Sequence, residues 1–223
     1  MKKKIIIIII VVLAIIIGGL LYYHFHHKCT ETSNGQKYGP NVDKPIIYLY
    51  PEKEMNIEVK LPNKEYITVS YPKYVNGWNV KAYPDGTLID NNTGRELYSL
   101  YYEAKYNIKP NMNEGFIVKG EDTISFLEEK LEILGLNEKE AEEFIVYWLP
   151  KLEVNKYNYI YFASIDEINE KMPLELSETP DSLIRILMMY KPLDKRININ
   201  EQELTTATRS GFTVVEWGGT LIK

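Results

Sequence analysis

The sequence is poor in the residues that most enzymes use for nucleophilic and metal chemistry. Among its 223 residues there is one cysteine, Cys29, and all three histidines lie between residues 24 and 27. Residues 30–223 therefore contain neither His nor Cys. This excludes Ser-His-Asp and Cys-His catalysis there, and also His- or Cys-ligated zinc, copper and haem. We predict no metal site and no cofactor in that part of the chain.

Other chemical signals are also missing. A lone cysteine cannot form an intramolecular disulfide, so the fold must depend on its core. No G-x-G-x-x-G or Walker pattern is present, and Gly218-Gly219 is too short to cradle a phosphate. His24, His26, His27 and Cys29 are the one group with soft or borderline metal ligands. Nothing fixes a four-ligand geometry for them, so we assign them to a linker without a stated role.

The charge balance argues against nucleic acid as a partner. Without Lys2, Lys3, Lys4 and Lys28, residues 30–223 hold 22 basic against 31 acidic residues, a net charge of −9. Such a surface repels a phosphate backbone and an anionic membrane surface. The remaining chemistry is that of carboxylates, lysine or tyrosine, oxygen-ligated Ca²⁺ or Mg²⁺, or binding without catalysis.

One long apolar run predicts the location of the protein. Residues 5–23 carry no charge, and as a helix they would span about 28 Å, close to the roughly 30 Å of a bilayer core. Three lysines precede the run and no small-x-small cleavage site follows it. We predict a cytosolic tail (1–4), an uncleaved transmembrane signal anchor (5–23), a stalk (24–44) and an extracytoplasmic domain (45–223), in a single-pass protein of the cell membrane.

The pattern within 45–223 predicts an α+β domain. Met55–Leu61 alternates between apolar and polar residues, as a half-buried strand does. Asn76-Gly77 and Tyr83-Pro84-Asp85-Gly86 are turn signals between short β-prone runs. Ser182–Tyr190 is almost entirely apolar, which indicates a central strand buried on both faces. Strands, then helices, then strands indicate an antiparallel-dominated sheet or sandwich.

An inserted helical hairpin is predicted at about 121–149. Leu127 and Leu131 belong to an apolar stripe at helical spacing, and Gly135 marks the end of that helix. Asn137 and Glu140 have the spacing of a capping box for a second helix. We expect Trp148 to lie in the core, and Pro150 to end the second helix.

Four segments together resemble a family of uncharacterised bacterial and protist proteins. These are KPIIYLYP (44–51), a stretch containing GWNVKAYPDG (77–86), a stretch ending in EFIVYWLP (143–150), and GFTVVEWGG (211–219). The resemblance covers nearly all of 44–219. It implies no particular fold, activity or catalytic residue, because none is established for that family.

The candidate site residues are aromatic and charged residues on the predicted strands. Trp78 and Trp217 are strand tryptophans beside glycines, with either a core or a binding role. Arg185 interrupts the most apolar strand and needs a carboxylate partner if it is buried. Glu216 and Glu103 are the candidates for that partner. The predicted binding residues are thus Trp78, Arg185, Glu216 and Trp217.

Three functions remain open from the sequence. The leading hypothesis is a non-enzymatic membrane-anchored domain that binds an envelope glycan or a protein. The second is a glycan hydrolase with Glu103 and Glu216 as its carboxylate pair, which would require both groups in one open cleft, about 5–5.5 Å or about 6.5–9.5 Å apart. The third is an assembly or scaffold subunit without a ligand, which a large exposed apolar patch would indicate.

Overall fold

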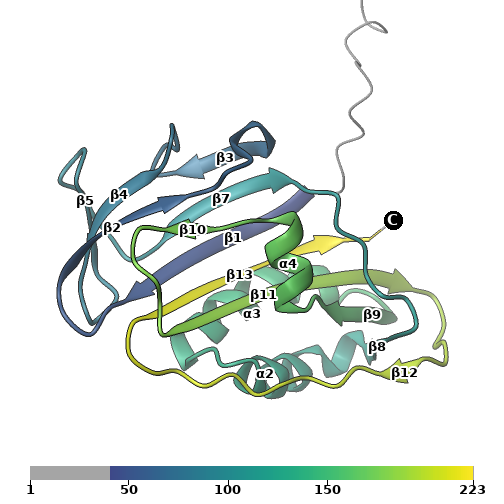
Figure 1. The fold of residues 1–223 in the computed structure, drawn as a ribbon. Helices are drawn as coiled ribbons and strands as arrows, with labels where there is room; N and C mark the ends of the chain where they lie inside the picture. Colours follow the sequence, from purple (N-terminus) through teal and green to yellow (C-terminus); the bar gives the residue numbers. More distant parts are fainter. Residues whose placement is uncertain (1–40, 223) are drawn as a thin grey trace, which may run out of the picture. The chain divides into compact units, whose positions relative to one another are not determined.

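The fold described here is that of residues 41–222 in a computed structural model. These residues form three layers (Figure 1). An eight-stranded sheet has a five-stranded sheet packed on one face and the helix pair α2–α3 on the other. The fold is α+β and most strand pairs are antiparallel, as predicted. The described residues belong to one compact unit, which contains both apolar cores.

The larger sheet places the predicted central strand near its middle. Its order is β12-β8-β9-β11-β13-β1-β7-β3. Two neighbouring pairs, β11 with β13 and β12 with β8, are parallel, and the others are antiparallel. In sheet order the strands are β12 (Asn200–Glu201), β8 (Glu114–Lys119), β9 (Tyr157–Phe162), β11 (Ser182–Leu193), β13 (Thr213–Leu221), β1 (Asn41–Tyr50), β7 (Leu100–Lys105) and β3 (Ile67–Tyr71).

The smaller sheet comes mainly from short strands between residues 55 and 97, with β10 added from later in the chain. The alternation in its second strand turns Ile57 and Val59 into the core between the sheets. The predicted turn before β5 is present, with the Asp85 carboxylate accepting from the Thr87 N–H at 2.9 Å. In sheet order the strands are β10 (Glu175–Leu176), β2 (Met55–Lys60), β4 (Trp78–Ala82), β5 (Leu88–Asp90) and β6 (Glu96–Leu97).

The predicted helical hairpin is formed by α2 (Thr123–Ile133) and α3 (Glu138–Leu152), with the 3-10 turn η2 (Gly120–Asp122) before α2. Gly135, at φ +90°, lies just beyond α2 in a conformation that favours glycine. The capping box of α3 is confirmed, because the Asn137 side chain accepts from the Glu140 N–H at 2.9 Å and Glu140 accepts from the Asn137 N–H at 2.9 Å.

The expectation that Pro150 ends the second helix is wrong. The helix continues through Pro150 to Leu152. Proline removes the hydrogen bond to the carbonyl four residues earlier, here that of Val146. Val146 and Pro150 are both exposed, so this side of α3 faces solvent and water can solvate that carbonyl.

The hairpin covers the sheet through a second apolar core. Phe144 and Trp148 are fully buried there, which confirms the core assignment of Trp148. Gly219 on β13 makes room for the indole, since a Cβ at that position would lie 2.6 Å from the Trp148 ring. The bare backbone at Gly219 therefore lets the large ring lie directly on the sheet.

The structure differs from the sequence prediction at one strand boundary and in elements that were not predicted. The first strand starts at Asn41, before the expected boundary at Pro45, because Val42 is buried and Thr220 donates to the Asn41 carbonyl at 2.7 Å. A short helix, α4 (Ile165–Lys171), was not predicted, although Ser164 and Glu167 form a capping box at its start. Residues 64–66 add the 3-10 turn η1 (Lys64–Tyr66).

The predicted anchor and the His24, His26, His27 and Cys29 group lie outside the described residues. Within residues 41–222, no helix has the length and apolar character needed to cross a membrane.

Candidate functional site

Arg185 and Glu216 are directly paired. Their strands run side by side with Arg185 opposite Glu216, and both side chains point into the core between the two sheets. The guanidinium Nε lies 2.6 Å from Oε2 of Glu216, and both residues are buried. The prediction that Arg185 pairs with one of the two candidate glutamates is confirmed for Glu216.

The polar groups of this pair are satisfied by neighbours from two other elements. Arg185 also donates to the side-chain oxygen of Asn169 in α4 at 2.8 Å. It donates as well to the main-chain carbonyl of Met172, at the end of α4, at 2.7 Å. The Tyr102 hydroxyl donates to Glu216 Oε1 at 2.6 Å. Burial, followed by the Glu216 charge, raises the pKa of Tyr102 well above its usual value. The network thus joins α4, β7, β11 and β13 inside the core.

Glu103 lies on the opposite face of the larger sheet. Its neighbours Tyr102 and Ala104 point into the core between the sheets, so its own side chain points to the helix face. It accepts from the Tyr101 hydroxyl at 2.6 Å. Glu103 and Glu216 therefore do not share a cleft, and the proposed carboxylate pair is corrected: the sheet itself separates the two groups.

The two strand tryptophans are core residues. Trp78 is 3% exposed between the sheets and donates to the Pro72 carbonyl at 2.8 Å. Trp217 is fully buried under the helices, with its ring 5.3 Å from that of Phe144. Together with Arg185 and Glu216, all four predicted binding residues are buried. None of them presents its side chain to a ligand at the surface, which corrects that prediction.

A half-buried charged cluster surrounds Glu103 where β1 bulges. Lys44 adopts a left-handed φ of +61° there, and its ammonium lies 5.6 and 5.5 Å from the ring centroids of Tyr101 and Tyr147. Burial, followed by the Glu103 charge, raises the pKa of Asp43. The carboxylates and lysines of this cluster lie close together, so they compensate one another's charge.

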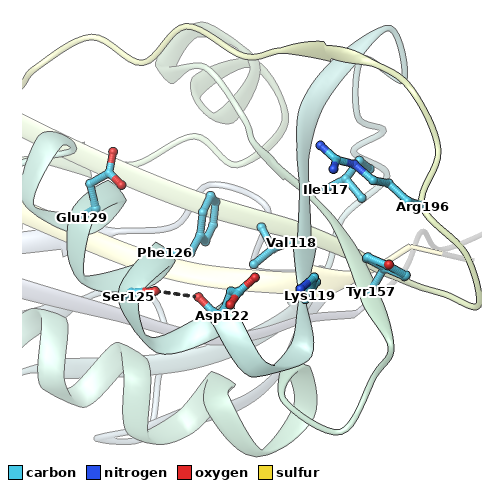
Figure 2. Close-up of a pocket in the computed structure, with 9 residues that line it drawn as sticks. All are labelled: Ile117, Val118, Lys119, Asp122, Ser125, Phe126, Glu129, Tyr157 and Arg196. Carbon is cyan, nitrogen blue, oxygen red and sulfur yellow. Dashed lines mark hydrogen bonds between the residues drawn. The ribbon is translucent and has the colours of Figure 1, made fainter.

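An open cleft lies instead at the far edge of the larger sheet, between β8 and α2 (Figure 2). It has a volume of about 390 Å³ and adjoins a hollow of about 240 Å³ that shares five of its lining residues. Figure 2 shows β8 and the Tyr157 and Arg196 side chains on one wall, with the start of α2 forming the other wall. The cleft is lined by Ile117, Val118, Lys119, Asp122, Ser125, Phe126, Glu129, Tyr157 and Arg196.

Gly120 sets the corner between the two walls. A Cβ at this position would lie 2.2 Å from the Asn155 carbonyl oxygen and 2.4 Å from that of Glu153. The chain after β8 therefore passes directly against the loop that follows α3. This close approach turns α2 back alongside β8 and leaves the cleft between them.

Several cleft groups are not used by the fold. Asp122 occupies the N-cap position of α2, but its carboxylate makes no capping hydrogen bond. Ser125 donates to the Asp122 main-chain carbonyl instead, at 3.1 Å. Arg196 is exposed and forms no hydrogen bond or ion pair with any residue between 41 and 222. The Asp122 carboxylate and the Arg196 guanidinium are therefore free to bind an external molecule.

The apolar part of the cleft is rigidly supported. The Phe126 ring stacks on Phe162 with centroids 6.5 Å apart and meets Phe116 edge-on at 5.2 Å. Tyr157, at the start of β9, is only partly buried. The cleft thus combines two aromatic side chains with cations and carboxylates.

Sequence reasoning missed this cleft. Tyr157, Asp122 and Arg196 are distant in the chain and match no motif. The one local signal was a basic residue, Arg196, in the polar segment that follows the central strand. Its position beside β8 depends on the path of that segment across the sheet edge, which no periodic pattern encodes.

Within the described part of the chain, no group of three or more His, Cys, Asp or Glu residues is arranged to hold a metal ion. Comparison of the chain with protein-family models, with curated proteins and with solved structures gave no match.

Proposed function

We propose that this protein is a single-pass membrane protein whose folded domain is displayed outside the cell and binds an envelope glycan without catalysis. The apolar run at 5–23 and the lysines before it support the anchor and its orientation. The open cleft beside β8 is the proposed ligand site.

The composition of the cleft is the observation that carries the glycan proposal. A sugar ring has apolar C–H faces, which pack on aromatic rings, and hydroxyl groups, which both donate and accept hydrogen bonds. Phe126 and Tyr157 supply apolar surface. Arg196 and Lys119 supply donors, and Asp122 supplies acceptors.

Binding is favoured over hydrolysis by the placement of the carboxylates. The carboxylate pair predicted from sequence is divided by the sheet, and Glu216 is buried with its oxygens bonded to Tyr102 and Arg185. Asp122 and Glu129 do share the cleft, but seven residues separate them at the start of one helix. Their main-chain positions are therefore about 10 Å apart along the helix axis, longer than the roughly 5–5.5 Å between the carboxyl groups of a retaining pair and the roughly 6.5–9.5 Å of an inverting pair.

The ligand test uses an array of envelope oligosaccharides followed by calorimetry on the glycan that binds. Tyr157→Ala and Arg196→Ala should each weaken binding about tenfold or more, because each removes a stacking surface or a charged donor. Tyr71→Ala and Arg95→Ala are the matched controls. Tyr71 is 51% exposed on β3, at the opposite edge of the sheet, and Arg95 is exposed between β5 and β6. Equal effects of cleft and control variants, or no glycan binding at all, would contradict the proposal.

The anchor has a separate test. If residues 5–23 are an uncleaved anchor, Cys29 stays in the mature protein on the outer side of the membrane. A membrane-impermeant maleimide should label it in intact cells, and Cys29→Ser should abolish the labelling. Labelling that requires permeabilised cells, or a mature N-terminus beyond residue 23, would reject this topology.

A further inference from the structure

The outer side of the helical hairpin contains a second and larger depression. This groove between α2 and α3 has a volume of about 780 Å³. Leu127, Phe144 and Trp148 turn to the sheet, so the groove lies among the residues that remain on the other side of the two helices. Its apolar lining comes from Val146, whose side chain is 67% exposed, from the partly buried Ala141 and Ile145, and from the edge of the buried Leu136, which also belongs to the core under the hairpin.

Around this apolar strip the groove is acidic, with five glutamates and one lysine, Lys139, in its lining. Residues 121–143 hold nine acidic and two basic residues, so this segment carries most of the net negative charge of the domain. Glu128, Glu132, Glu138 and Glu142 line the groove and form no ion pair with any residue between 41 and 222. Like charges this close repel one another, and a cation placed among them would relieve the repulsion.

We infer that this groove docks a basic amphipathic helix of a partner protein. The apolar strip between two carboxylate rows is complementary to a helix with an apolar face flanked by lysines or arginines. With 11 and 15 residues, α2 and α3 extend about 16 and 22 Å, which accommodates roughly three turns of a third helix. A second copy of this chain does not fit, because its own hairpin would bring the same negative charge.

The inference is independent of the proposed glycan site. Groove and cleft share only Glu129 among the lining residues, and the variants below leave Glu129 unchanged. A protein that binds the helix but no glycan, or the reverse, would therefore separate the two proposals.

The test uses residues 38–223, the compact unit that contains both cores. The probe is a fluorescein-labelled 14-residue peptide with leucines on one helical face and lysines flanking them. A scrambled peptide of the same composition is the reference. Anisotropy should show binding of the amphipathic peptide at least about tenfold tighter than that of the scrambled one, because only the former presents a continuous apolar face.

Two charge variants locate the binding surface. The groove variant carries Glu128→Lys, Glu132→Lys and Glu142→Lys. The matched control carries Glu52→Lys, Glu65→Lys and Glu178→Lys, which are exposed and lie outside the groove. Both change the net charge equally. The groove variant should weaken peptide binding about tenfold or more, and the control less than about threefold.

A third variant tests the apolar strip, since Ile145→Ser keeps the charge and should weaken binding about tenfold. Circular dichroism confirms that each variant is folded. If the lysine variant of the groove unfolds, glutamines at the same three positions replace it. Equal weakening by groove and control variants, no weakening by either, or equal binding of the scrambled peptide would overturn the inference. So would dimerisation through the groove, seen as a doubled mass that the groove variant abolishes.

Discussion

Removing the Arg185 charge should destabilise the domain unless Glu216 is neutralised with it. In Arg185→Met the Glu216 carboxylate stays buried and keeps only the hydrogen bond from Tyr102. Breaking one partner of a buried ion pair costs about 3–5 kcal/mol. Glu216→Leu should cost a similar amount, because it leaves a guanidinium in the core that cannot lose its proton.

The double variant separates pairing from packing. If the two losses were independent, Arg185→Met with Glu216→Leu would cost about 6–10 kcal/mol, comparable to the roughly 5–15 kcal/mol that stabilises a whole domain. If each single loss is the penalty of an abandoned charge, the double variant should be more stable than either single one, because no unpaired charge is left in the core. The expected coupling is therefore at least about 3 kcal/mol, at or above the upper end for residues in contact.

Urea unfolding of residues 38–223 at pH 7 measures these free energies, with the fluorescence of the three tryptophans as the signal. Trp78, Trp148 and Trp217 are all buried, so unfolding exposes each of them. Lys81→Met is the control. It breaks a pair with Glu54 at 3.0 Å in which both side chains are partly exposed, and it should leave the free energy of unfolding nearly unchanged. Additive single losses, or a loss below about 1 kcal/mol for Arg185→Met, would refute the reasoning.

Three further substitutions probe the rest of the domain by the same urea assay. Trp148→Ala should cost about 3–5 kcal/mol, because the ring is fully buried on Gly219, and a loss under about 1 kcal/mol would contradict this packing. Gly120→Ala should cost at least about 1–3 kcal/mol, since its Cβ meets main-chain oxygens at 2.2 and 2.4 Å, and wild-type stability would disprove that approach. Asp43→Asn should raise the unfolding midpoint at pH 7. Burial and Glu103 raise the folded pKa of Asp43, so its ionisation opposes folding, and the gain should shrink as the pH falls towards 4. An equal gain in the unfolding midpoint at pH 7 and near pH 4 would contradict a raised pKa of Asp43.

The sequence by itself determined the local elements and one tertiary contact. The alternation in 55–61 and the apolar run at 182–190 gave strands because their side-chain periods match a half-buried and a fully buried strand. The Asn137–Glu140 capping box marked the start of the second helix through its own hydrogen bonds. Gly135 marked the end of the first helix through its backbone freedom. Arg185 predicted a carboxylate partner because a guanidinium in an apolar strand cannot become neutral.

The tertiary structure decided which face each residue occupies and which distant segments meet. Glu103 and Glu216 were indistinguishable in sequence, yet the strand period turns them to opposite faces of one sheet. Trp78 and Trp217 are buried because separate layers cover the two faces, an arrangement that depends on strand order. The cleft was not predictable because Tyr157, Asp122 and Arg196 meet only after β8, β9 and the segment after β11 are brought together at a sheet edge. Such non-local pairing follows from the packing of the whole chain, and no local pattern records it.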